Sequence, residues 1–511
     1  MSKIKSFITN HFNIFAFIMF ATVVFSLYGE TVFFDWSYYD DAVLILDRQD
    51  YLSFSNIKNI FFDTVFDVET DKFCRPILNL TFLCEKYLYG IKPYGYHFTN
   101  LIIHLFSVFG IYLFLSLLYD NKKTFILCLL FACHPAIVQA VAWVPGRNDS
   151  LLTLLVAFSF YFFIKYIDVN KTSYLFGYLF CFALSLLTKE TSIFVPVFYF
   201  LLLLYKDRNF KKIVVNVIIW LLLIVLYLLY RKYVLSYQPS TLTFRILLDN
   251  FIISFPATTK YIANIFFPIK LSVFPSMLEV NYLLCITTIL VFVLLFLKFK
   301  AYDLKFVLTG FCWFFLFLFP TFLVSNNYFF DHRIYLPLVG ILIVMLELMK
   351  SFNNLFLKKF ICIILVVLLC FSAITIFYEQ KFKNKEVFWV NALSISPESD
   401  IPHAVIGQFL MDNGFYKEAE EYFLKAISLK EDSRHYGNLA VVYGRMREFD
   451  KMEKVLLKSL ELSKYNPLTY ANLALLYQLK GEKEKSQEMK DMYIRVYNMT
   501  NKNSKISDIN L

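Results

Sequence analysis

Residues 6–41 read SFITNHFNIFAFIMFATVVFSLYGETVFFDWSYYDD, and this stretch decides the fold of the chain. No Asp, Glu, Lys or Arg occurs from Ser6 to Gly29. An apolar run of about 20 residues is long enough to cross a lipid bilayer as a helix. The motif FFDWSYYDD follows and ends in the adjacent acids Asp40 and Asp41. The stretch therefore predicts a membrane helix that presents an acidic loop at one membrane surface.

The rest of the chain repeats this apolar pattern. Its 511 residues are 58% hydrophobic, and the mean hydropathy of +0.56 lies well above that of soluble proteins. We predict about eleven transmembrane helices from runs of suitable length. They lie near residues 11–28, 98–118, 124–142, 150–167, 173–188, 191–205, 213–235, 281–298, 305–324, 334–350 and 360–378. Beyond residue 380 charged residues dominate, which predicts an all-α membrane domain at 1–380 and a separate soluble tail.

The net charge of +10 could indicate nucleic acid binding, but its location indicates membrane topology instead. Sixteen cations gather in alternate short loops beside few acids. They are Lys3, Lys5, Lys122, Lys123, Lys165, Lys171, Lys206, Arg208, Lys211, Lys212, Lys298, Lys300, Lys305, Lys350, Lys358 and Lys359. Because Lys and Arg collect in cytoplasmic loops, this pattern predicts a cytoplasmic N-terminus and a tail on the opposite side.

The loops on the opposite side have a different composition. Residues 30–97 form the first outer loop and carry eleven acids against six Lys or Arg. Residues 236–280 are apolar but interrupted by Pro256, Pro268 and Pro275, so we expect an interfacial or re-entrant segment there. The nine cysteines show no metal-binding spacing.

The tail contains a repeat. Gly407, Ala440 and Ala474 recur at intervals of 33 and 34 residues, and an aromatic or Leu residue follows each by three. Small and aromatic residues at this period are typical of tetratricopeptide repeats, in which two antiparallel helices pack closely. We predict three repeats over 400–497, forming an α-solenoid, and a polar tail at 498–511. Such repeats bind or space partners and do no chemistry themselves.

The acidic pair is the first candidate site. Two close carboxylates repel each other, which raises the pKa of one of them and suits a general base. A solvated loop with scattered acids is the simpler interpretation of the pair alone. Further ionisable residues lie near the same predicted surface, where each alone could be an interfacial anchor. They are Arg75, His97, Arg147, Asp149, Lys189, Glu190, His332 and Arg333, with His104 and His134 somewhat deeper.

Five blocks in order give the chain a family resemblance. They are FFDWSYYDD, RPILNLTF with GYHFTNLIIH, HPAIVQAVAWVPGRNDSL, LLTKE and DHRIYLPLVG. With the repeats, they resemble the transmembrane and tetratricopeptide-repeat O-mannosyltransferases and their bacterial relatives, which are GT-C class glycosyltransferases. The resemblance covers about residues 30–350 together with the repeats.

The resemblance implies an inverting transfer of a sugar, such as mannose, from a polyprenyl or dolichyl phosphate to a hydroxyl of a protein or glycan. Asp40 and Asp41 match the acidic motif of the first outer loop and would supply the base. Positive charge would hold the lipid phosphate, and the candidates are Arg75, His97, Arg147, Lys189, His332 and Arg333. His134, Asp149 and Glu190 would support them. No nucleotide-binding loop is visible, and no cofactor is firmly predicted; a divalent metal on the acidic pair stays open.

Two other function classes compete with the transferase. A lipid or solute transporter would need ionisable residues at mid-membrane and internal symmetry, which the sequence does not show. A non-catalytic membrane scaffold would display the repeats to partners. We expect a bacterial inner membrane protein, or an endoplasmic reticulum protein if the source is eukaryotic, with the repeats periplasmic or lumenal and available to acceptors.

Overall fold

The structure is a computed structural model that describes residues 11–64, 73–235, 244–269, 271–275, 282–299, 302–323, 329–352 and 354–500. Every regular element in these residues is helical. The chain divides into two compact units, Met1–Phe388 and Trp389–Leu511. The two units are described separately below.

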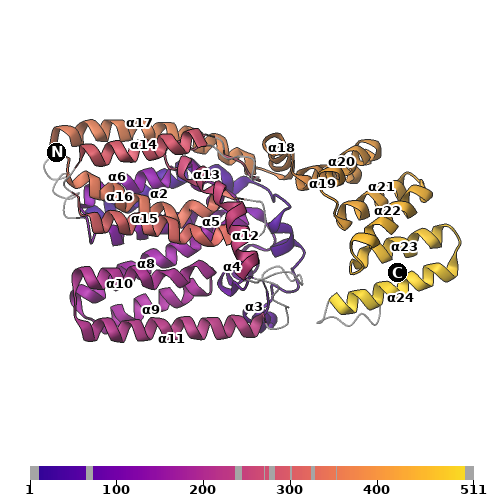
Figure 1. The fold of residues 1–511 in the computed structure, drawn as a ribbon, viewed down its shortest axis with the longest axis horizontal. Coiled ribbons are helices and arrows are strands. Elements are labelled where there is room, and N and C mark those ends of the chain that lie inside the picture. The colour runs from indigo at the N-terminus through magenta and orange to yellow at the C-terminus, as the bar shows by residue number, and fades with distance from the viewer. Residues whose placement is uncertain are drawn as a thin grey trace. The chain divides into compact units, whose positions relative to one another are not determined.

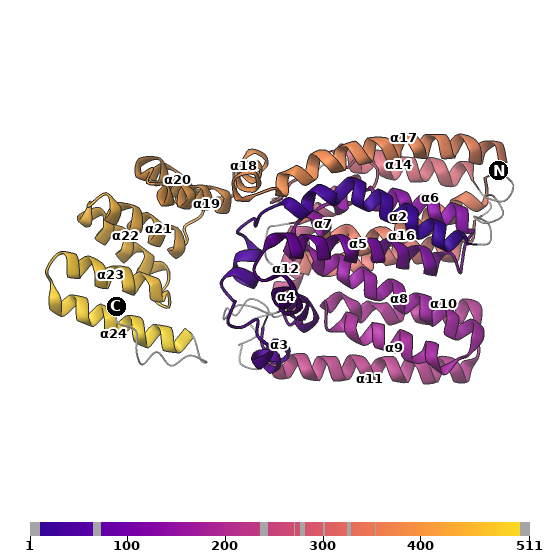
Figure 2. The same cartoon turned by 180° about the vertical axis from the view of Figure 1, so that it is seen from behind.

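The first unit is a bundle whose long helices run side by side (Figure 1). The long helices are α2 (Phe12–Tyr28), α5 (Pro93–Leu115), α6 (Asn121–Ala132), α8 (Arg147–Val169), α9 (Thr172–Leu186), α10 (Val195–Lys206), α11 (Phe210–Val234), α14 (Tyr282–Lys298), α15 (Leu304–Leu318), α16 (Tyr335–Lys350) and α17 (Asn354–Glu379). The shorter helices are α3 (Ile57–Phe62), α4 (Pro76–Tyr89), α7 (Gln139–Ala142), α12 (Phe244–Ser254) and α13 (Thr258–Ala263). The view from behind shows the same arrangement (Figure 2).

Seven of the helical segments in the described residues are long and apolar enough to cross a membrane. They are Phe12–Phe33, Pro93–Leu115, Val144–Val169, Phe210–Val234, Leu304–Leu323, Asp331–Lys350 and Phe356–Phe382. An eighth would be the pair Asn121–Ala132 and Pro135–Ala142, which is bent by 58°. The bend has a local cause, because Pro135 cannot continue the hydrogen bonding of α6.

The expected number of about eleven is therefore reduced to seven or eight. The other three predicted runs also form helices, but these are shorter. Thr172–Leu186 and Tyr282–Lys298 are apolar helices below the spanning length, and α10 has 12 residues. The α10 run is shortened because its first part, Glu190–Phe194, is a 3-10 helix that precedes Pro196. The all-α membrane domain followed by helical repeats is confirmed.

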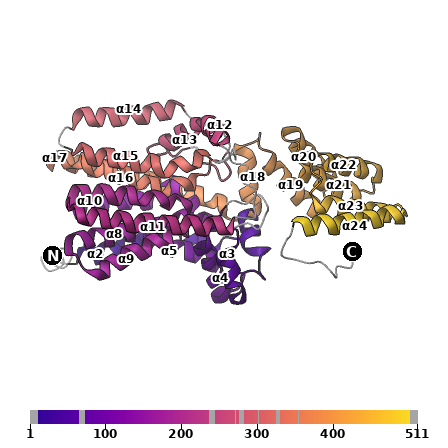
Figure 3. The same ribbon diagram turned by 60° about the horizontal axis from the view of Figure 1, so that its bottom comes forward.

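The two ends of this bundle differ. The short helices α3, α4, α12 and α13 gather at one end, opposite the end at which α2 begins, here called the N-terminal end (Figures 1 and 3). At the N-terminal end, polar side chains cap helices: Asp120 accepts from the N–H groups of Lys122 and Lys123, and Asp303 from that of Lys305. Such caps satisfy backbone donors that a helix start leaves free.

The segment predicted to be interfacial contains no spanning helix among its described residues. It holds α12, with 11 residues, and α13, with 6. Its residues 236–243, 270 and 276–281 lie outside the described part of the chain. Elsewhere in this unit, α15 and α16 pack closely at Gly310 and Gly340. A Cβ added to either glycine would lie within 2.5 Å of the carbonyl oxygen of the other.

The second unit is a series of helix pairs. After α18 (Lys385–Ile395) come α19 (Asp400–Asp412), α20 (Tyr416–Leu429), α21 (Ser433–Arg445), α22 (Phe449–Leu462), α23 (Pro467–Leu479) and α24 (Lys483–Thr500). The predicted small residues are at the helix contacts: a Cβ on Gly407 would lie 3.2 Å from the Phe423 ring, and Ala440 and Ala474 are buried. Residues 501–511 lie outside the described part.

Candidate functional site

The acidic loop, residues 34–41, folds around the carboxylate of Asp41. Asp41 Oδ1 accepts hydrogen bonds from the Ser37 hydroxyl (2.7 Å) and the Tyr39 N–H (2.9 Å). Asp41 Oδ2 accepts from the N–H groups of Ser37 (2.6 Å) and Tyr38 (3.3 Å). The turn is tight enough to place Tyr38 in the left-handed region, with φ of 57°. Asp41 is 1% exposed, so its main task is to hold the shape of the loop.

Asp40 is in a different environment, although it is the next residue in the chain. Its side chain is partly buried, and no group in the described part of the chain donates a hydrogen bond to it. Burial and then the neighbouring charge of Asp41 raise the pKa of Asp40 to about 7, although Arg75 and Arg333 oppose the rise. A carboxylate that changes charge near neutral pH, with its oxygens free, is suited to accept a proton from a substrate.

Trp143 fastens the acidic loop to the bundle. Its indole N–H donates to the Ser37 hydroxyl oxygen at 3.1 Å. Its ring stacks on Tyr39, with centroids 6.0 Å apart and planes at 15°, and on Phe330, at 5.8 Å and 25°. Trp143 directly precedes the segment Val144–Val169, and Phe330 directly precedes the segment Asp331–Lys350. The loop is therefore held against the starts of two membrane helices.

Arg75 lies beside the loop at the start of α4. Its Nη2 is 3.4 Å from Glu190 Oε2, and the two side chains are 14% and 22% exposed. With the Asn148 amide oriented to donate to the Thr188 carbonyl oxygen, the Asn148 oxygen accepts from Arg75 Nη1 at 2.9 Å. The buried Arg75 Nε has no partner in the described residues. Because its ion pair is long, Arg75 retains donor capacity for an anion.

Lys189 is held between acids and cations. Its ammonium lies 2.8 and 2.7 Å from the two oxygens of Asp149. Burial lowers the pKa of Lys189, Asp149 opposes this, and the charges of Arg75 and Arg333 lower it further. Three cations from separate segments are therefore close enough to repel one another, and this concentration of positive charge would attract an anion.

His332 and Arg333 approach the same place from the start of α16. His332 Nδ1 lies 3.1 Å from Gln139 Oε1, and its Nε2 lies 3.7 Å from Asp149 Oδ2. The Arg333 guanidinium lies over the Phe330 ring at 5.6 Å. The structure thus brings Asp40, Arg75, Lys189, His332 and Arg333 together, with Asp149 and Glu190 as their acidic neighbours.

Arg147 is placed differently from the other candidate cations. It is 0% exposed, with Nη1 2.6 Å from Glu85 Oε1, and Nη2 donates to the Tyr96 carbonyl oxygen at 2.8 Å. Its guanidinium also lies 4.9 Å from the Phe82 ring centroid. With its charge already neutralised inside the protein, Arg147 joins α4, α5 and α8 and is not placed to hold a substrate phosphate.

His97, predicted near the surface, and the deeper His104 and His134 are also enclosed. His97 is buried edge-on against Phe34 at 6.1 Å. His104 Nδ1 is 2.6 Å from the Tyr335 hydroxyl. His134 Nδ1 accepts from the Ala136 N–H (3.2 Å), so its Nε2 carries the proton and donates to the Ile265 carbonyl oxygen (3.1 Å). These contacts hold backbone turns and helices rather than an open site.

Sequence reasoning missed several residues around the site. Ser37, Gln139 and Trp143 have no charge, so a search for ionisable groups passes over them. Lys260 and Asp331 form a buried ion pair of 3.2 Å, and a charged residue in an apolar segment is the signal that could have found Lys260.

The described residues hold no group of three or more His, Cys, Asp or Glu side chains that could bind a metal ion. Within the described residues, Asp40 and Asp41 gain no third such ligand from a neighbouring segment, so these residues do not reach the usual count of oxygen ligands for a divalent metal.

Comparison with known proteins gives two family matches. Residues 87–231 match the dolichyl-phosphate-mannose-protein mannosyltransferase family, and residues 403–433 and 434–466 match tetratricopeptide repeats. The first match includes Lys189 and its acidic neighbours but not Asp40, Arg75 or Arg333.

Individual relatives point in the same direction. The chain is 30% identical over 182 residues to human protein O-mannosyl-transferase TMTC2, a match that covers 33% of this chain and 22% of the relative. It is 32% identical over 127 residues to human TMTC3, covering 24% and 14%. A protein O-mannosyl-transferase of Caenorhabditis elegans is 23% identical over 382 residues, covering 70% and 53%. The chain thus spans from about a seventh to about half of these relatives. It is a distant relative of the protein O-mannosyl-transferases, in which a stretch that matches the dolichyl-phosphate-mannose-protein mannosyltransferase family, residues 87–231, is followed by tetratricopeptide repeats.

Proposed function

We propose that this chain is a membrane glycosyltransferase that moves mannose from a lipid phosphate to a hydroxyl group of a protein, with inversion at the anomeric carbon. The observation that carries the proposal is the partly buried carboxylate of Asp40, which accepts no hydrogen bond from the described residues and lies near Arg75 and Arg333, whose charges both favour its ionised form. The family match and the names of the relatives support the donor and acceptor classes.

Asp40 takes the proton from the acceptor hydroxyl as that oxygen forms a bond to the anomeric carbon. The bond between this carbon and the phosphate oxygen breaks, and its electron pair leaves with the lipid phosphate. The negative charge that develops on this leaving group needs nearby positive charge. Arg75 and Arg333 suit it best because a guanidinium can grip two phosphate oxygens.

The remaining candidates take supporting roles in this proposal. Asp41 positions the loop through Ser37 and the backbone. Lys189 and His332 add polar groups near the phosphate, with Asp149 and Glu190 holding Lys189 and Arg75 in place. Arg147, His97 and His134 act in the fold, since each is enclosed by protein.

The proposed topology keeps eleven crossings by counting α9, α10 and α14 as short spans beside the seven long segments and the bent pair. The N-terminus and the Lys-rich loops are then cytoplasmic, and the acidic loop is periplasmic, or lumenal in a eukaryote. The Asp35 N–H donates to the Lys383 carbonyl oxygen at 2.9 Å, so the first unit ends next to the acidic loop. This favours repeats on the same side as the loop, where they could recruit acceptor proteins.

The proposal is tested by mass spectrometry of glycoproteins from a strain that lacks this chain. We expect O-linked mannose on specific proteins to disappear, and to return with the parent chain or with Asp50→Asn. Asp50 is an exposed acid of the first outer loop, outside the acidic loop itself, which makes it a matched control. Asp40→Asn should be produced in the membrane but fail to restore the glycans. Unchanged glycans in the deletion strain would contradict the transferase proposal.

A further inference from the structure

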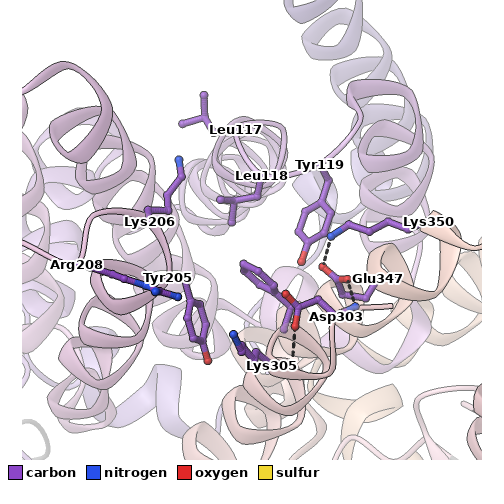
Figure 4. Close-up of a pocket in the computed structure, with 11 residues that line it drawn as sticks. Leu117, Leu118, Tyr119, Tyr205, Lys206, Arg208, Asp303, Lys305, Glu347 and Lys350 are labelled. Carbon is purple, nitrogen blue, oxygen red and sulfur yellow. Dashed lines mark hydrogen bonds and ion pairs between the residues drawn. The ribbon is translucent and has the colours of Figure 1, made fainter. Parts of the chain in front are cut away.

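A cavity of about 260 Å³ opens at the end of the bundle where α5, α10 and α16 end, and Figure 4 shows the side chains that line it. It lies among the turn after α5 and the ends of α10 and α16, and it includes the start of α15. Its charged lining consists of four cations and two acids: Lys206, Arg208, Lys305, Lys350, Asp303 and Glu347. The proposed transfer reaction uses none of these residues.

One side of the cavity is formed by Glu347 and Lys350, whose charges are paired with each other. Glu347 is 0% exposed; its Oε1 lies 2.7 Å from the Lys350 ammonium, and its Oε2 accepts from the Asp303 N–H at 3.2 Å. The Lys350 ammonium also lies 5.0 Å from the Tyr119 ring centroid. The Asp303 carboxylate is occupied too, since it caps the Lys305 N–H at 3.0 Å. Glu347 and Lys350 therefore neutralise each other, whereas the Asp303 carboxylate keeps its negative charge, because a hydrogen bond from a neutral N–H does not cancel it.

The other side holds cations with spare donors. Among the described residues, the terminal nitrogens of Arg208 and the ammonium of Lys305 have no hydrogen-bond or ion-pair partner. Arg208 Nε donates only to the Leu204 carbonyl oxygen at 3.3 Å. Lys206 pairs with Asp168 at 2.9 Å, but these side chains are 26% and 42% exposed, and an exposed pair is weak. Positive charge is therefore available at this wall of the cavity.

The backbone at Arg208 is unusual. Its φ is 51°, and its N–H donates to the Leu203 carbonyl oxygen at 3.0 Å as α10 ends. Glycine is the residue that ordinarily fills this left-handed position after a helix, because any Cβ is strained there. Arg447, after α21, has a similar φ of 61°, so an arginine is accommodated at such a position in both units; at Arg208 the position places the side chain in the cavity lining.

The rest of the lining consists of three apolar side chains and the tyrosines Tyr119 and Tyr205. Leu117, Leu118 and Phe306 face the cavity beside the cations, and the helices around it end at the expected membrane surface. A fully soluble anion gains nothing from such a lining, whereas a lipid can place its glycerol and first methylenes there. The volume is below the ~300 Å³ at which pockets for larger ligands begin, so a headgroup fits better than a whole sugar lipid.

We infer that this cavity binds the phosphate of an anionic phospholipid, with Arg208 and Lys305 as its main ligands and Lys206 as a third cation. The site would fix this end of the bundle to a negatively charged leaflet, as basic pockets at membrane surfaces do. It is separate from the proposed donor site and does not depend on the transfer reaction.

The binding test uses the full chain in non-ionic detergent and a short-chain phosphatidylglycerol as the probe. We expect saturable binding that weakens by about tenfold in Arg208→Gln/Lys305→Gln. The matched control is Lys122→Gln/Lys211→Gln, which removes two exposed cations at the same end of the bundle but outside the cavity, and should bind like the parent. If lipid binding weakened equally in both double variants, the cause would be general attraction between charges, and the proposed site would be overturned.

Two further measurements sharpen this result. Inorganic phosphate should compete only at much higher concentration than the lipid; equal competition would indicate a site for small anions and overturn the lipid assignment. Arg208→Gly should relieve the backbone strain and raise the thermal unfolding temperature while it weakens lipid binding. If Arg208 served only the fold, the Arg208→Gly variant would be more stable and would still bind the lipid. Unchanged lipid binding in this more stable variant would therefore contradict the inference.

Discussion

The two ends of the membrane unit use charged residues in opposite ways. At the end with the acidic loop, most charged groups are buried and connected, such as Asp149 with Lys189 and Arg147 with Glu85. At the N-terminal end, Lys206 and Arg208 lie at the rim of an open cavity with weaker partners. Buried charges are costly unless paired, and their retention at the first end indicates a function that needs a fixed arrangement. The predictions below test this contrast.

The largest effect is expected at the acidic pair. Asp40→Asn removes the proton acceptor with little change in shape, so the transfer rate should fall by roughly 100- to 10,000-fold. Asp41→Asn keeps an oxygen that can accept from the backbone, so it should lose much less activity. Single-turnover transfer from a lipid-phosphate mannose measures both rates. Equal losses in the two variants would contradict the separate roles of these neighbours.

The next effect concerns stability at the same end. Glu85→Gln leaves the fully buried Arg147 without its counter-charge, which costs about 3–5 kcal/mol when a buried pair is broken. The thermal unfolding temperature in detergent should drop clearly. The matched change at the other end, Asp168→Asn, breaks the exposed pair with Lys206 and should cost no more than ~1 kcal/mol. If both variants unfold like the parent, the contrast between the ends is wrong.

Donor binding separates the arginines at the acidic end. Arg75→Lys or Arg333→Lys keeps the charge but loses the two-pronged grip on a phosphate, so donor affinity should weaken by about tenfold, or ~1.4 kcal/mol. Binding of a lipid-phosphate mannose to the full chain measures this. An affinity like that of the parent in both variants would remove these arginines from the phosphate site.

The smallest effect is expected for the anchor of the acidic loop. Trp143→Phe retains most of the stacking on Tyr39 and Phe330 but removes the hydrogen bond to Ser37. A single hydrogen bond contributes about 0.5–1.5 kcal/mol, so activity should fall severalfold while the protein stays folded. A variant as active as the parent would show that Trp143 only fills space.

The sequence predicted the kinds of element better than their lengths. Every apolar run became a helix, and the repeat period led to the right helix pairs. The predicted helix lengths differ from the structure where a local feature cuts a helix, as at Pro135 or at the 3-10 segment before Pro196. Apolar composition indicates that a segment lies in the membrane. It does not show where the backbone hydrogen bonding of a helix is interrupted.

The candidate site was predicted in part for a similar reason. Charge marked Arg75, Lys189 and Arg333, which the fold brings together. Charge alone could not distinguish them from Arg147, whose partner Glu85 lies 62 positions away in the chain. Nor could it distinguish Asp40 from Asp41, since the difference depends on where four backbone and hydroxyl donors point.

The most direct test of the central claim is the pH dependence of kcat/KM for mannosyl transfer. A base must be ionised, so activity should fall as the pH drops through the pKa of Asp40, at about 7. Arg333→Gln removes a charge that lowers this pKa and should move the fall to higher pH. Asp41→Asn removes a charge that raises it and should move the fall to lower pH, while Asp50→Asn should leave it in place. Opposite shifts in the two variants are the predicted result; a profile that is flat near pH 7, or that neither variant moves, would contradict Asp40 as the base.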